Sequence, residues 1–153
     1  MRPDRMISDS EAKKILQSGK YGILSTVSSD GVPYGVPVNY FYIPEDNALY
    51  FHCALKGRKL DNITSNSKVS FVVTGKEQIV EERFTTYYES VIIAGTASVL
   101  TDEEEKREKL VQLCEKLAPT AVERRDAVIT KQLPAVAIVK VTICEITGKR
   151  NQS

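Results

Sequence analysis

The stretch FHCALKGRKLDNI, residues 51–63, guides the fold prediction, because an apolar strand passes through a glycine and two adjacent cations into the start of a helix. The first N–H groups of a helix have no partner within the helix and carry the positive end of the helix dipole. Gly57 allows close approach of the backbone, and Arg58 and Lys59 add a guanidinium fork and a point charge. The junction can therefore hold a phosphate group, although the same residues also fit an ordinary solvated basic turn.

The composition indicates one domain spanning residues 1–153, because 153 residues with 42% hydrophobic content can bury one core but not two comfortable ones. With 21 Lys and Arg against 20 Asp and Glu, the net charge of +1 provides no field that would recruit nucleic acid or an acidic membrane. The three cysteines are widely spaced and form neither a disulfide framework nor a zinc pattern. Without an N-terminal leader or a run of about 18 apolar residues, we expect a cytoplasmic protein.

Strand-like alternation dominates the chain before residue 58. A capping box at Ser8–Glu11 predicts a short opening helix that stops at Gly19. Three strands that form a meander are then expected at 21–28, 34–43 and 48–54, with an Asp30-Gly31 turn after the first. Pro33 and Pro37 remove ladder donors from the second strand, which therefore suits a sheet edge, a bulge or a barrel rim.

The rest of the chain mixes further strands with short helices. After a helix that begins near Arg58, a strand pair is expected at 68–74 and 78–84 around Gly75-Lys76, and a long strand bent at Gly95 at 88–100. Capping boxes at 101–104 and 120–123 predict two helices, the first ending before Pro119 and the second running to about residue 131. A final strand is expected from 135 to about 147. Roughly seven strands in this length predict a mainly β fold, a closed or nearly closed antiparallel barrel.

His52 is the only histidine, so the sequence offers no site with two histidine ligands for a metal. Strand alternation places His52 on the face opposite Phe51 and Cys53, beside the proposed phosphate junction. The residue fits either an ordinary packed or surface histidine or one that faces a ligand. Cys53 has no CxxC partner and fits a small buried apolar residue.

Three segments in this order resemble the pyridoxamine 5′-phosphate oxidase-like FMN-binding split barrels: 34–40 (YGVPVNY), 51–59 and 90–97 (SVIIAGTA). Within that superfamily, residues 51–63, 88–91 and the ending ITGKR at 146–150 are most similar to the 5-nitroimidazole antibiotic resistance, or nitroimidazole reductase, branch. The resemblance covers residues 7–150. It implies an α+β fold, an antiparallel split β-barrel of about 6–7 strands with a few short flanking helices.

The resemblance also implies a flavoprotein that binds FMN at the interface of a homodimer. The FMN phosphate would be held by Arg58 and Lys59, which follow Gly57, and Ser90 and Val91 would reach the flavin from the later long strand, in their own subunit or in the partner. The isoalloxazine ring would pack along Val38, Asn39 and Tyr40 and beside His52, Cys53 and Ala54. The nitroimidazole branch places a histidine near the flavin at the position of His52, which makes this residue the catalytic candidate.

The implied function is an FMN-dependent oxidoreductase that reduces small planar acceptors such as nitroimidazoles with electrons from a reduced nicotinamide. Pyridoxine phosphate oxidation is not expected, because the true oxidase has a tyrosine at the position of His52 and a C-terminal extension with tryptophan and arginine, whereas this chain has no tryptophan and ends at Ser153. Two alternatives stay open. One is a non-catalytic flavin-binding or storage module, since no nicotinamide fingerprint is present; the other is a related barrel that binds another ligand such as haem.

Overall fold

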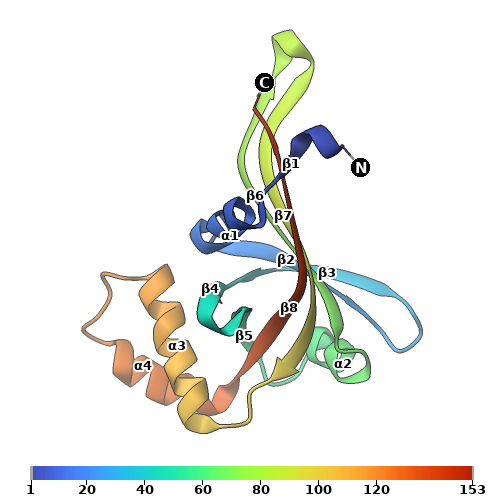
Figure 1. Cartoon of the computed structure of the whole chain (residues 1–153). Coiled ribbons are helices and arrows are strands. Elements are labelled where there is room, and N and C mark those ends of the chain that lie inside the picture. Colours follow the sequence, from blue (N-terminus) through green and yellow to red (C-terminus); the bar gives the residue numbers. More distant parts are fainter. Residues whose placement is uncertain (1, 153) are drawn as a thin grey trace.

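The computed structural model describes residues 2–152 and confirms the α+β, mainly β prediction; Met1 and Ser153, the ends of the predicted domain, lie outside the described residues. These residues form eight strands and four α-helices, with short 3-10 turns between some of them (Figure 1). The elements are β1 Met6–Ile7, α1 Asp9–Ser18, β2 Tyr21–Val27, β3 Pro33–Asn39, β4 Phe41–Ile43, β5 Ala48–Ala54, α2 Arg58–Ser65, β6 Lys68–Val80, β7 Thr85–Val99, α3 Glu103–Leu117, α4 Arg125–Gln132 and β8 Val136–Asn151.

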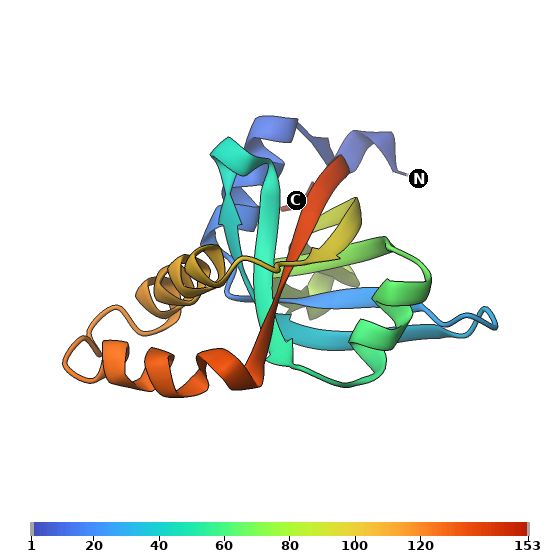
Figure 2. The same cartoon turned by 90° about the horizontal axis from the view of Figure 1, so that it is seen from below.

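One antiparallel sheet contains all eight strands. Its order is β3-β2-β6-β7-β8-β5-β4, and β1 pairs with the end of β8. The sheet curls around its interior without closing, which agrees with a split barrel (Figure 2). The helices α3 and α4 lie together on one side of the barrel, whereas α2 follows β5 on another side (Figure 1).

The predicted meander of three strands is wrong. The expected strand 34–43 breaks at Tyr40 into β3, which pairs with β2, and β4, which pairs with β5, so the two hairpins lie at opposite ends of the strand order. The break arises because Tyr40 leaves the ladder: its side chain is buried and its backbone N–H donates to the Lys20 carbonyl at 3.2 Å. The edge position expected from Pro33 and Pro37 is confirmed, since β3 is the terminal strand.

The predicted strand pair around Gly75-Lys76 is also wrong. Strand β6 continues to Val80, and the register shift between Gly75 and Gln78 is a bulge in which Lys76 adopts φ +48°. The chain turns later, in a 3-10 turn at Glu81–Arg83. The result is a β6–β7 arm that projects beyond the other strands (Figure 1). The predicted irregularity at Gly95 is confirmed by a register shift between Ala94 and Gly95 against β8.

The three predicted helix caps differ in how well they match the structure. The Ser8–Glu11 capping box is confirmed at α1. The next helix has its N-cap at Asp102, one residue later than predicted, because the Asp102 carboxylate accepts the hydrogen bond from the Glu105 N–H. The capping box at 120–123 is wrong, since α4 begins only at Arg125 and has no side-chain cap. The final strand extends to Asn151, beyond the expected end at 147.

Two apolar clusters hold the fold together. The barrel interior is filled by aromatic and aliphatic side chains such as Leu24, Phe51, Phe71 and Ile93. A second cluster joins α3 and α4 to β4, β5 and β8. Burial of each large apolar side chain contributes roughly 1.5–3 kcal/mol. Within residues 2–152, no helix combines the length and the apolar character that crossing a membrane requires.

Candidate functional site

The basic turn before α2 has the backbone geometry that the phosphate prediction requires. Gly57 is the N-cap of α2 and adopts φ +157° and ψ 171°, a region that glycine occupies far more readily than other residues. A Cβ atom at this position would meet nothing within 4 Å, so the space in front of the helix is open. No side chain caps the helix, which leaves its first N–H groups free to bind an anion.

A buried hydrogen bond fixes α2 against the barrel. The amide nitrogen of Asn62 donates to the hydroxyl of Thr26 on β2 at 2.9 Å, and both residues are buried. Ile63 belongs to the barrel interior, and Leu60 packs against it. Since these contacts hold one face of the helix, the N-terminus of α2 has a defined position relative to β2 and β5.

The two cations at this helix start are placed differently. Arg58 is exposed, and its guanidinium lies 4.9 Å from the centroid of the Tyr34 ring on β3. Lys59 is half-buried and lies close enough to Cys53 for its charge to act on that thiol. Neither cation forms an ion pair with any residue of the described range 2–152. Both charges are therefore available for an anion at the end of α2.

A small cavity of about 120 Å³ lies behind Arg58, between α2 and the β2–β3 hairpin. Its lining residues are Ser28, Asp30, Val32, Tyr34, Arg58 and Asn62. A hydrogen bond from the Ser28 hydroxyl lowers the pKa of the Asp30 carboxyl below its ordinary value, so this group carries a negative charge at pH 7. Because a carboxylate repels phosphate, the open front of the helix suits an anion better than this cavity.

The end of β5 exposes His52 and Ala54 and half-buries Cys53. Partial desolvation lowers the pKa of His52 below its ordinary value, so the imidazole is neutral at pH 7 although part of the ring contacts solvent. Burial raises the pKa of the Cys53 thiol, and the charge of Lys59 lowers it to a smaller extent. A neutral thiol that packs against the core behaves as an apolar residue.

The predicted ring-binding residues on and after β3 point in different directions. Val38 packs against the core, and Asn39 is exposed with its amide nitrogen donating to the Lys20 carbonyl at 3.1 Å. Tyr40 is fully buried: its hydroxyl donates to the Leu16 carbonyl at 2.6 Å and its ring meets Phe71 edge-on at 5.1 Å. Tyr40 therefore has only its backbone to offer a ligand.

The predicted residues on β7 lie far from β5 in one chain. Val91 is buried in the barrel interior, whereas Ser90 faces outward. Ser90 pairs with Lys149 of β8, and His52 pairs with Ile138 of the same strand. These partners are eleven residues apart on β8, which corresponds to about 35 Å of strand. One chain thus brings together the β5 and α2 residues but does not bring Ser90 to His52.

Ser90 shares its face of the sheet with an apolar row that the sequence analysis missed. Cross-strand pairing places Pro37, Ile23, Val72 and Ile92 side by side across β3, β2, β6 and β7. Ile23 is 38% exposed and Ile92 is 46% exposed. The alternation of each strand could have indicated which residues face outward, but the strand order that joins them into one surface was not readable from the sequence.

The sequence profile of the pyridoxamine 5′-phosphate oxidase family matches residues 8–150. No curated protein matches the sequence significantly. Among solved structures, a candidate 5-nitroimidazole antibiotic resistance protein from Bacteroides thetaiotaomicron is 22% identical with a TM-score of 0.78, covering 94% of this chain and 85% of that one.

Two further structures carry cofactors in their descriptions. The flavocytochrome Anf3 from Azotobacter vinelandii is 23% identical with a TM-score of 0.80, covering 95% of this chain and 68% of that one. An FAD-binding protein from Mesorhizobium loti is 23% identical with a TM-score of 0.69, covering 97% of this chain and 98% of that one. At these identities the similarity shows a shared fold.

Proposed function

Because the chain belongs to the pyridoxamine 5′-phosphate oxidase family, we propose that it binds FMN and uses it as an oxidoreductase. The observation that carries the proposal is the uncapped start of α2, where Gly57, Arg58 and Lys59 offer free N–H groups and two cations without an ion-pair partner among residues 2–152. The phosphate would accept hydrogen bonds from this turn, with Arg58 moving off Tyr34 to reach it. The structural relatives described as FAD-binding or as a flavocytochrome support a flavin as the ligand.

The ring of the flavin would lie beside the outward residues of β5 and β3. Asn39, His52 and Ala54 are exposed and can contact a ligand with their side chains, whereas Tyr40 and Val91 can contribute only backbone groups or shape. Bound FMN would carry electrons from a reduced nicotinamide to a small planar acceptor such as a nitroimidazole. The neutral imidazole of His52 would orient that acceptor through one N–H donor and one ring-nitrogen acceptor.

Comparison of FMN with riboflavin tests the phosphate site. Charge-assisted hydrogen bonds are worth roughly 1.5–3 kcal/mol each, so the double variant Arg58→Ala/Lys59→Ala is expected to weaken FMN binding at least about a hundredfold. Riboflavin, which lacks the phosphate, is expected to bind the wild type much more weakly than FMN. The matched control is Lys56→Ala, which removes an exposed charge one residue before Gly57 and is expected to change affinity less than about threefold.

The same flavin titrations distinguish the phosphate site from other ligands and from a storage role. Equal binding of riboflavin and FMN, or full FMN binding by the double variant, would exclude the phosphate site. Tighter binding of FAD than of FMN would change the assigned cofactor but keep the flavin. A Soret band in the purified protein without flavin absorbance would favour haem, and FMN binding without turnover of any acceptor would favour a storage module.

We also propose a homodimer in which the outward face of β3, β2, β6 and β7 meets the same face of a second copy. The apolar row on this face is exposed, and α3 and α4 cover other strands, namely β4, β5 and β8. Stable dimers bury roughly 1,200–2,000 Å² in total, which a face of four strands can supply. Since Ser90 lies on this face, it would reach the flavin bound at the α2 turn of the partner.

Mixing two defective variants tests whether the site is shared. In a shared site, a subunit with Arg58→Ala/Lys59→Ala still supplies Ser90, and a subunit with Ser90→Trp still supplies the α2 turn. Equal mixing is expected to give about half hybrid dimers, each with one intact site, so about one quarter of the wild-type FMN capacity returns. No recovery from variants that fold and exchange subunits would contradict a shared site, and a monomer that keeps FMN would contradict the dimer.

A further inference from the structure

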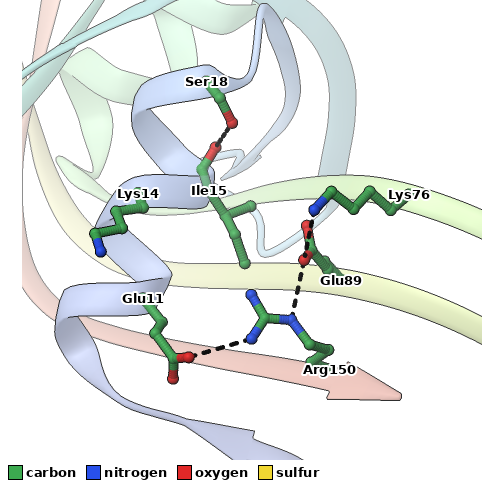
Figure 3. A pocket seen from close by; sticks show the side chains of 7 residues that line it. All are labelled: Glu11, Lys14, Ile15, Ser18, Lys76, Glu89 and Arg150. Atoms are coloured by element: carbon green, nitrogen blue, oxygen red, sulfur yellow. Dashed lines mark hydrogen bonds and ion pairs between the residues drawn. The ribbon is translucent and has the colours of Figure 1, made fainter. Parts of the chain in front are cut away.

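A charged cavity of about 340 Å³ lies between α1 and the sheet (Figure 3). It is separate from the α2 turn, since α1 and α2 lie at different places on the barrel (Figure 1). Its lining residues are Glu11, Lys14, Ile15, Ser18, Lys76, Glu89 and Arg150. The four residues from α1 have the spacing of one helical face. The other three come from β6, β7 and β8, which are neighbours in the sheet. The cavity is thus a junction between the first helix and three central strands.

A buried carboxylate forms the floor of this cavity. The side chain of Glu89 is only 6% exposed, and its Oε1 atom accepts a hydrogen bond from Arg150 Nε at 3.0 Å. Lys76 Nζ lies 3.6 Å from the same oxygen. The bulge in β6 places Lys76 here, in a left-handed backbone conformation that is uncommon for residues other than glycine. Since a lone buried charge is costly, the ion pairs with Arg150 and Lys76 compensate for the burial of the Glu89 carboxylate.

Arg150 is held in one orientation by two carboxylates. Its Nε atom donates to Glu89, and its Nη1 atom donates to Glu11 at 3.2 Å. The remaining nitrogen, Nη2, forms no hydrogen bond within residues 2–152 and points into the cavity toward Ile15 (Figure 3). A guanidinium that is already fixed, with one free N–H edge, loses little freedom when it binds an anion.

The charges around the cavity select the kind of anion. Three cations and two carboxylates line it, which leaves one positive charge in excess. We propose that this cavity binds a small monocarboxylic acid, whose carboxylate contacts Arg150 Nη2 and Lys76 Nζ and whose apolar part contacts Ile15. A monoanion balances the excess charge, whereas a dianion such as phosphate would place a second negative charge beside Glu89. A cation would be repelled by the excess.

The test uses two probes of the same shape, isobutyrate and its uncharged amide, isobutyramide. We expect isobutyrate to bind the full chain with a Kd of about 1 mM at low ionic strength, as six non-hydrogen atoms allow. Amide NMR shifts should be confined to α1 and to the neighbourhoods of Lys76, Glu89 and Arg150. Isobutyramide and inorganic phosphate should bind at least about tenfold more weakly.

Variants at exposed positions keep the test independent of folding. Lys76→Gln is expected to weaken isobutyrate binding about threefold to tenfold, because Lys76 is largely exposed and its charge is partly screened. Lys13→Gln removes the same charge from an exposed residue of α1 that does not line the cavity, and should leave binding unchanged. Equal binding of the amide, or equal effects of the two lysine variants, would overturn the proposal. FMN titration in the same samples reports separately on the α2 site.

Discussion

Replacement of Lys116 by methionine is expected to stabilise the protein at pH 7 by about 1–2 kcal/mol. The ammonium of Lys116 on α3 is buried and has no hydrogen-bond partner within residues 2–152. Desolvation, with a smaller effect of the Lys20 charge, lowers the pKa of Lys116 from its ordinary 10.5 to about 8. That difference corresponds to about 3 kcal/mol against the charged form. A cation–π interaction with the Tyr40 ring, whose centroid lies 4.5 Å from the ammonium, offsets about 1–2 kcal/mol of this cost.

The sign of the pH dependence follows from where the proton binds. Between pH 8 and 10.5, Lys116 is protonated in a larger fraction of unfolded molecules than of folded molecules. The free energy of unfolding of the wild type therefore rises with pH in this window. Below pH 8 both states are protonated and the folded state carries the full penalty. Methionine keeps the length and the apolar stem without the charge. The advantage of Lys116→Met should therefore be largest at pH 7 and fade toward pH 10.

Urea unfolding followed by far-UV circular dichroism, at pH 7 and pH 9.5, measures both quantities. Lys131→Met is the matched control, because Lys131 is exposed on α4 and its replacement should change stability by less than about 0.5 kcal/mol. A Lys116→Met protein less stable than wild type at pH 7 would refute the reasoning, since attraction to Tyr40 would then outweigh desolvation. Parallel pH profiles of wild type and variant would refute it as well.

Substitutions at three further positions examine the candidate site. Asn62→Ala should destabilise the fold by about 1–3 kcal/mol in urea unfolding, because it leaves the buried Thr26 hydroxyl without its partner. Gly57→Ala should cost about 1–2 kcal/mol and weaken FMN binding in fluorescence titration, because the strain is in the backbone and no atom lies within 4 Å of the new Cβ. His52→Ala should leave the FMN Kd within about threefold of the wild-type value while slowing nitroaromatic reduction by roughly 10²–10⁴. His52→Gln should keep most of the activity if His52 orients the acceptor rather than supplying a proton.

Local signals in the sequence located the strand and the helix that flank the candidate site. The predicted helix near Arg58 and the strand 48–54 are confirmed as α2 and β5, because a glycine before two cations and a short run of mostly apolar and aromatic residues act over a few positions. The prediction at Gly75-Lys76 failed for a physical reason. A tight turn and a bulge can both contain a residue with positive φ, as Lys76 has here, and only the pairing on either side distinguishes them.

The true turn of that hairpin was hidden by its residue types. Two turns of the chain share one geometry, a 3-10 turn followed by a left-handed residue: 44–46 with Asn47 and 81–83 with Phe84. Asparagine is enriched in that conformation, so the first turn was predictable, whereas phenylalanine is rarely found there. Phe84 is also 99% exposed, which a pattern of buried apolar residues cannot anticipate.

Strand order, which no short pattern encodes, decides whether one chain alone can bring Ser90 to His52. Sequence similarity pointed to Ser90 and to His52 alike, but register on β8 separates their positions by about 35 Å of strand within one chain. Ser90 shares its face with exposed Ile92, so the surface that we propose as the dimer interface also carries Ser90. If both residues serve one flavin, two chains are required, and the exposed face is then a necessary part of the binding site.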